Sequence, residues 1–239
     1  VGTATSGNIT ISADEPVAGG GATDGTGTVT FVTGNANFAG ATILADGTAD
    51  GTITIEGEAV SLFNFSANAG DSTLNIITNR DLTGAGGITN DADDNVAELA
   101  AGTINLTTNN GSVGASGQEV AFQASTEINA DAGTGNVFLK TVGTADATTD
   151  ATETFNVGLI EGVTIELESS ANFADVDAAD NSDIIGTTVT LTSANGIGAT
   201  GTNAAIEVDA TTLTANNTLG AAETGGVFIN GTGTGGISV

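Results

Sequence analysis

Two acidic segments of the chain contain the side chains best suited to binding a metal ion. In the first segment, Asp91, Asp93 and Asn95 occupy the first, third and fifth positions of a calcium-loop pattern. Carboxylate and amide oxygens at this spacing are ligands of Ca²⁺ in EF-hand loops. Val96 stands where that loop needs glycine, and Gly102 stands where it needs a bidentate glutamate. The segment therefore predicts a calcium candidate that is not an EF-hand.

The second acidic segment has four aspartates on one predicted loop, and they are Asp175, Asp177, Asp180 and Asp183. Carboxylates gathered on a loop can surround a hard cation, or they can hold solvated counterions without a specific site. Repeats of the Gly-Gly-x-Gly-x-Asp type, which bind calcium in other stacked proteins, are absent from the sequence. Calcium is the single cofactor that the sequence suggests, and the other expectation is a protein without a cofactor.

Pairs of carboxylates on predicted strands raise the question of catalysis. Glu166 and Glu168 alternate with apolar neighbours, as do Glu56 and Glu58, so each pair lies on one outer strand face. Two carboxylates within reach are the minimum for glycoside hydrolysis. A general acid, however, needs burial to raise its pKa, and nothing apolar flanks these outward positions. The chain also lacks Trp and Tyr for sugar platforms, and His and Cys for a nucleophile–base pair. We expect a protein that is not an enzyme, and a polysaccharide-processing β-helix enzyme is the distant alternative.

Charge narrows the set of partners. The chain of 239 residues has 29 acidic residues and 2 basic ones, Arg80 and Lys140, which give a net charge of −27. Contacts to phosphates need Lys and Arg in number, so nucleic acid is excluded as a partner. No run approaches the ~18 apolar residues of a membrane-spanning helix. An acidic surface keeps a protein soluble in concentrated salt and attracts divalent cations, which favours a location outside the cell.

Short strands, rather than helices, must position these side chains. Thr, Val and Ile alternate with polar residues, and 36 glycines but a single proline punctuate them. The leading strands centre on Ile9, Val29, Ile53 and Leu74, which follow one another at nearly regular intervals. This spacing suits one coil of a solenoid.

Part of the chain is repeated. Thr103–Ala115 (TINLTTNNGSVGA) aligns with Thr188–Ala199 (TVTLTSANGIGA) with one residue deleted, and Gly135–Leu139 aligns with Gly225–Ile229. The offset between the two copies drifts slightly through insertions in loops. Strands that match while loops vary are typical of stacked repeats, because only the strands must stay in register with their neighbours. The repeat relates residues 102–142 to residues 186–232.

Two all-β architectures can use this pattern. An antiparallel β-sandwich favours hairpins with two-residue Asn-Gly turns, and tight pairs of that kind are scarce here. A parallel β-helix needs short strands with Gly or Asn at its corners, and Asn110-Gly111 and Asn195-Gly196 fit such corners. We predict one continuous parallel β-helix over residues 1–239, a segment of a longer chain or a filament subunit. At ~22 residues per coil it would have about 11 coils. The β-sandwich is the alternative.

Aromatic and amide side chains are expected to stack between coils. Same-face neighbours one coil apart bury each other, so we place six phenylalanines inside the rod rather than on a ligand platform. They are Phe31, Phe63, Phe65, Phe138, Phe155 and Phe228. For the same reason, asparagines at the corners are expected to form ladders of side-chain hydrogen bonds.

The last quarter of the chain resembles a known family of repeats. Thr188–Ala199, the strand Ile206–Ala215 with its V-D-A-x-x-L-T-A pattern, and Gly225–Ile229 look like the repeats of filamentous-haemagglutinin-like bacterial exoproteins and giant adhesins. The resemblance extends, less closely, to residues 102–142 and is weak before residue 100. It implies a right-handed parallel β-helix in a secreted or surface-anchored protein that adheres to cells, polysaccharide or sister filaments. The secretion domain of that family is not in this sequence, so no export route carries over.

Two functions are expected from these observations. The first is a non-catalytic stalk segment of a bacterial surface or secreted adhesin, extracellular and active in cell adhesion or biofilm, with host-cell or matrix polysaccharide as its partner. The second is a self-assembling subunit of an extracellular filament or sheath, whose partners are further copies joined end to end. The second is favoured by the two ends of the sequence, because Val1 begins without a capping helix and Gly236–Val239 reads as a strand in mid-coil. Electron microscopy separates the two, because one predicts single rods and the other predicts filaments.

Overall fold

The computed structural model describes residues 9–12, 28–31, 42–44, 52–57, 59–62, 66–68, 73–78, 86–90, 97–142, 153–176, 181–201, 204–217 and 225–233. Within these ranges the fold is all β. No helix in them has the length and hydrophobicity needed to cross a membrane. The strands are β1 (Ile9–Ser12), β2 (Thr28–Phe31), β3 (Thr42–Leu44), β4 (Thr52–Gly57), β5 (Ala59–Leu62), β6 (Ser66–Asn68), β7 (Thr73–Thr78), β8 (Ile88–Asn90), β9 (Leu99–Thr107), β10 (Val120–Asp131), β11 (Val137–Thr141), β12 (Phe155–Glu161), β13 (Thr164–Ser169), β14 (Asn172–Asp175), β15 (Ile184–Ser193), β16 (Gly196–Ile197), β17 (Ile206–Asn216) and β18 (Ile229–Gly231).

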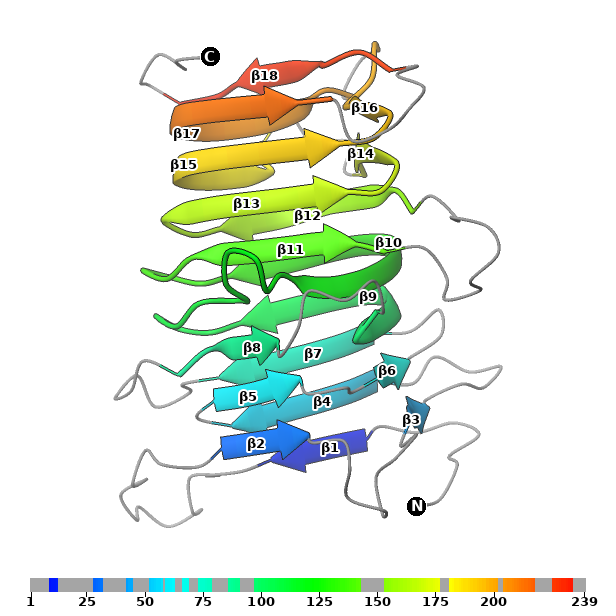
Figure 1. Ribbon diagram of the computed structural model, residues 1–239, viewed down its shortest axis with the longest axis vertical. Helices are drawn as coiled ribbons and strands as arrows, with labels where there is room; N and C mark the ends of the chain where they lie inside the picture. Colours follow the sequence, from blue (N-terminus) through cyan, green and yellow to red (C-terminus); the bar gives the residue numbers. More distant parts are fainter. Residues whose placement is uncertain are drawn as a thin grey trace.

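The strands stack in parallel coils, which confirms the predicted β-helix and contradicts the antiparallel sandwich. Every pairing between the named strands is parallel. Fifteen strands form one sheet, and β2, β5 and β8 form a second. In Figure 1 the nearer strands β5 and β13 run one way and the strands behind them, β4 and β12, run the other. Since the chain climbs from blue to red, the coils are right-handed.

The coils are longer and fewer than the predicted 11. The length of a coil is the distance along the sequence between two residues that pair in adjacent coils. One such coil runs from Ile160 to its partner Ile184, and a longer one runs from Leu74 to its partner Ile104. Ile9 pairs with Ile53, and Val29 pairs with Val60, so the strands around Ile9 and Val29 are two faces of the same coil. The prediction counted some of these faces as separate coils, and this error made the coil appear shorter than it is.

Columns of apolar side chains fill the interior. The Val113 column consists of residues that pair in adjacent coils and are all fully buried: Val60, Ile88, Val113, Val137, Ile165 and Val189. The Ile104 column is built in the same way from Ile53, Leu74, Ile104, Ile128 and Val157. Strand neighbours of these residues point to the opposite face, which is why buried and half-buried positions alternate along β4 and β7. Each fully buried Val, Leu or Ile stabilises the fold by about 1.5–3 kcal/mol.

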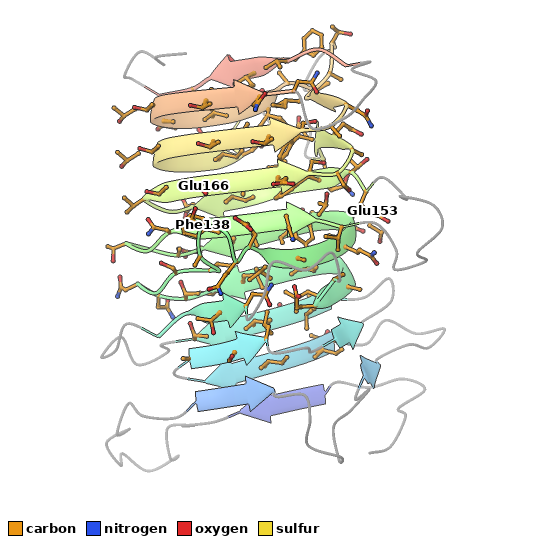
Figure 2. The ribbon with its side chains drawn as sticks, in the orientation of Figure 1. Phe138, Glu153 and Glu166 are labelled. Atoms are coloured by element: carbon orange, nitrogen blue, oxygen red, sulfur yellow. The ribbon has the colours of Figure 1, made fainter. Side chains whose placement is uncertain are left out.

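Phenylalanines form a third column. The ring centroids of Phe122 and Phe155 are 4.9 Å apart, those of Phe155 and Phe173 are 4.8 Å apart, and all three rings are fully buried. Interior stacking is therefore confirmed for Phe155. The same prediction is wrong for Phe138. This residue is buried, at 8% exposed, but it alternates with the core residues of β11 and lies on the opposite face of that strand, beside Glu166 of β13 in Figure 2. Phe228 is half-buried, and the side chains of Phe31, Phe63 and Phe65 lie outside the described residues.

Glycines and hydroxyls hold the corners of the coils. A Cβ atom on Gly111 would lie 1.8 Å from the carbonyl oxygen of Gly86, and one on Gly135 would lie 1.9 Å from that of Gly111. Backbones of successive coils therefore approach too closely for a side chain. Buried hydroxyls close these turns, since Thr108 Oγ1 donates to the Gly111 carbonyl at 2.6 Å and Ser193 Oγ donates to the Gly196 carbonyl at 2.7 Å. Both turns contain the Asn-Gly pairs that were predicted to form corners.

A ladder of asparagine side chains runs along the rod, on the strands rather than at the corners. Asn105 Nδ2 donates to Asn75 Oδ1 at 2.9 Å, and Asn129 Nδ2 donates to Asn105 Oδ1 at 3.0 Å. The last member accepts a hydrogen bond from the backbone N–H of Leu159 at 2.8 Å. The predicted ladder thus exists, but its members lie in β7, β9 and β10, where Asn75 pairs with Asn105 and Asn105 pairs with Asn129. At the corner, Asn110 instead has a φ of 113° and accepts a bond from Thr134.

The two segments that are alike in sequence have the same local hydrogen bonds on different faces of the rod. The N–H of Gly114 donates to the Ile88 carbonyl, and the N–H of Gly198 donates in the same way to the Phe173 carbonyl. Ile104 lies in the Ile104 column, whereas its counterpart Val189 lies in the Val113 column. The second segment therefore sits one face further around the rod than the first.

Candidate functional site

The structure brings three carboxylates together, and two of them are predicted metal ligands. Asp175 ends β14, Asp183 directly precedes β15, and Glu207 is the second residue of β17. One side-chain oxygen from each lies within 4.8 Å of the other two. Asp183 is 3% exposed and Glu207 is 2% exposed, while Asp175 is half-buried. We call these three residues the Asp183 cluster.

Strand register positions the two buried members of the cluster. Ile206 and Val208 point into the core, so Glu207, which lies between them in β17, points to the opposite side. The N–H of Asp183 donates to the Glu207 carbonyl at 2.9 Å, and the N–H of Glu207 donates to Asp183 Oδ2 at 2.9 Å. The two residues belong to adjacent coils, 24 residues apart. The cluster therefore spans the boundary between two coils.

One oxygen of the Glu207 carboxylate is buried with no hydrogen-bond partner among the described residues, and it is Oε2. A buried acceptor left in this state costs about 1–3 kcal/mol, and more when the group is charged. The structure therefore contains a carboxylate oxygen that is sheltered from water and still able to accept a bond.

The pKa of Asp183 indicates that the three carboxylates of the cluster repel one another and would be stabilised by a positive charge. Burial, together with the charges of Asp175 and Glu207 and a side-chain hydrogen bond with Glu207, raises the pKa of Asp183 to about 8. The hydrogen bond from the Glu207 backbone opposes this rise. Without another cation, Asp183 therefore keeps a proton near neutral pH.

The remaining predicted metal ligands are not placed. Asp177 and Asp180, from the same loop as Asp175 and Asp183, lie outside the described residues. So do Asp91, Asp93 and Asn95 of the first acidic segment. Of the seven predicted residues, the structure thus describes Asp175 and Asp183, and it brings them together.

Reasoning from the sequence missed Glu207. The residue was treated as part of a repeat strand, and its distance from the acidic loop along the chain concealed its position. Two signals could have revealed it. An acid between Ile206 and Val208 interrupts an apolar run. It also follows Asp183 by the same interval that separates Ile184 from its partner Val208 in the next coil.

Three of the four carboxylates considered for catalysis lie within the described residues, on outer strand faces. Glu166 is half-buried in register with Phe138, and Glu168 is exposed in register with Lys140. Glu56 is half-buried in β4, and Glu58 lies outside the described residues. Burial raises the pKa of a further acid, Glu153. Figure 2 places Glu153 at the edge of the rod and Glu166 on its front face, so these two acids lie on different sides.

Comparison of the chain with protein-family models, with curated proteins and with solved structures found no match. The function is therefore argued from the residues of this chain.

Proposed function

We propose that this chain is a non-catalytic stalk segment of an extracellular bacterial adhesin. The observation that carries the proposal is the continuous chain of parallel pairings that runs from β4 through β7, β9, β10, β11, β13, β15 and β17 to β18. Each coil bonds to the coils before and after it, and each adds ~4.8 Å to the length of the rod. Such a stack forms a long rod that presents similar strands along its whole surface. Length and a repeated surface are the properties that a stalk needs.

The outer surface supports this proposal. Along β13 the buried residues Ile165 and Leu167 alternate with Thr164, Glu166 and Glu168, so polar and acidic groups face outward. A net charge of −27 keeps such a surface hydrated and soluble in salt. The same charge repels acidic polysaccharides, so the partner class that we propose is neutral polysaccharide of a host cell or matrix.

The test combines shape, turnover and binding of the purified chain. Electron microscopy and small-angle scattering are expected to reveal single rods, and incubation with a panel of polysaccharides is expected to release no fragments. Binding to immobilised polysaccharide should be stronger for neutral polymers than for uronate-rich ones at low salt. Long filaments would instead favour a self-assembling subunit, and measurable chain cleavage would overturn the non-catalytic role.

A further inference from the structure

The described part of the structure contains a second arrangement that matches the Asp183 cluster residue by residue. In the earlier segment, the N–H of Glu98 donates to the Ala121 carbonyl, and the N–H of Ala121 donates to Glu98 Oε2 at 2.8 Å. This reproduces the pair of bonds between Asp183 and Glu207. Glu98 therefore corresponds to Asp183, and Ala121 corresponds to Glu207.

Two more positions of the earlier arrangement correspond to positions in or beside the Asp183 cluster. Ala121 pairs with Lys140 in the next coil, as Glu207 pairs with Asn230. Asn90 lies two residues after Ile88, as Asp175 lies two residues after Phe173, and these two carbonyls accept the equivalent glycine bonds described above. Asn90 thus corresponds to Asp175, and Lys140 corresponds to Asn230.

The charges at these four positions differ sharply. The earlier arrangement has one acid, Glu98, and a base, Lys140, which is only 5% exposed. The Asp183 cluster has three acids, and Asn230 occupies the position that corresponds to Lys140. The first arrangement therefore includes a basic side chain, whereas the second has two more carboxylates and no base at the corresponding position. Three carboxylates so close together, two of them buried, need a compensating positive charge.

We propose that Asp175, Asp183 and Glu207 bind one Ca²⁺ ion, which supplies the positive charge that Lys140 brings to the corresponding positions of the earlier segment. Calcium binds oxygen ligands at ~2.3–2.6 Å, so ligand oxygens around one ion lie up to about 5 Å apart, in agreement with the 4.8 Å limit of the cluster. The buried Oε2 of Glu207, which has no partner among the described residues, is a free ligand atom. Asp175 is only half-buried, and we expect water to complete the coordination on its side of the cluster.

The ion would tie two coils and a loop together. Asp175 and Asp183 lie at the two ends of the connection between β14 and β15, and Glu207 belongs to the following coil. Binding to the folded state alone stabilises that state, because the ligands are brought together only there. This inference stands apart from the proposed stalk function, since a calcium site at this position is equally compatible with any role of the rod.

The test uses the whole chain after treatment with a chelator. Calorimetric titration with CaCl₂ is expected to reveal one site per chain, and CaCl₂ is expected to raise the thermal midpoint beyond an NaCl control of equal ionic strength. Glu207→Gln should weaken calcium binding about tenfold or more, since affinity follows the number of charged ligands. Asp209→Asn, on the same strand but exposed and outside the cluster, should leave binding unchanged.

A second variant keeps the proposal testable if Glu207→Gln fails to fold. Asn230→Lys restores the lysine of the earlier segment, so it should raise the midpoint in chelator and remove most of the response to calcium. The proposal is overturned if the unaltered chain responds to CaCl₂ no more than to NaCl, or if Glu207→Gln responds as fully as the unaltered chain. An equal response to MgCl₂ would contradict the assignment to calcium, because Mg²⁺ requires shorter distances and retains its waters.

Discussion

Asp183 and Glu207 bond to each other through their backbones and through the Asp183 carboxylate, although both residues are acids and both are buried. The bond from the Glu207 N–H to Asp183 Oδ2 compensates only part of the burial of that carboxylate, as the raised pKa of Asp183 indicates. In the absence of a metal ion, the pair therefore makes stability depend on pH.

We expect the free energy of unfolding in chelator to fall between about pH 4 and pH 8 because of Asp183. Its pKa rises from 3.8 to about 8 on folding, so below pH 4 both states hold the proton. As pH rises, the unfolded chain releases a proton that the folded chain still binds, and the loss of stability is complete once the folded group ionises near pH 8. The charged groups that face Asp183 are Asp175 of β14 and Glu207 of β17.

Asp183→Asn isolates this effect, because an amide does not titrate but can still accept the bond from the Glu207 N–H. The stability of the variant relative to the original chain should increase from about pH 4 to pH 8, as measured by urea unfolding in chelator. If the two stability curves stay parallel over that range, Asp183 does not have the raised pKa.

The asparagine ladder is expected to depend on its middle member. Asn105→Asp keeps an acceptor for Asn129 but loses the donor to Asn75 Oδ1, which then faces a second acceptor. We expect a cost of about 1–3 kcal/mol at neutral pH, measured by urea unfolding. Part of this cost should be recovered near pH 4, where a protonated aspartate can donate again. A loss that is independent of pH would mean that the ladder bonds contribute little.

The corner glycines should tolerate no side chain. Gly111→Ala places a Cβ against the carbonyl of Gly86, so two coils must move apart, at a cost of about 3 kcal/mol. Gly117 is the matched control, since nothing lies within 4 Å of its added Cβ and only its φ of 74° opposes a side chain. Gly117→Ala should cost about 1 kcal/mol. A loss in Gly111→Ala no larger than that in Gly117→Ala would contradict close contact between coils as the reason for glycine at position 111.

The phenylalanine column should be more sensitive to truncation than the outer face of the rod. Phe155→Ala removes the central ring of three and should cost about 3–5 kcal/mol. Phe138 is also buried, at 8% exposed, but its ring lies outside the core cluster, so Phe138→Ala should cost less than Phe155→Ala. The comparison requires only thermal or urea unfolding of both variants. The assignment of Phe138 to the outer face is contradicted if the two losses are alike.

Local sequence was sufficient to predict the strands and the parallel stack. Alternation around Ile53 and Ile55 places both residues in the core, and the Asn110-Gly111 pair lies at a corner, as expected. These features depend on the alternation of apolar and polar residues along a strand and on the residue types that form turns. Both can be recognised within a short segment of sequence.

Features that depend on register could not be predicted in the same way. The number of coils was overestimated because a strand on a new face looks like a strand in a new coil, as with Ile9 and Val29. Phe138 was misplaced because Val, Phe and Leu follow one another in β11, and an unbroken apolar run does not reveal which residues point inward. Glu207 was missed because its position beside Asp183 follows only from the length of that particular coil.

The two related segments occupy different faces of the rod, since Ile104 and Val189 belong to different interior columns. A surface group at equivalent positions in the two segments therefore points in two different directions. If further segments continue the same displacement, equivalent groups follow a spiral around the axis. A partner could then meet an equivalent contact whichever side of the rod it approached, and several partners could bind one rod without colliding.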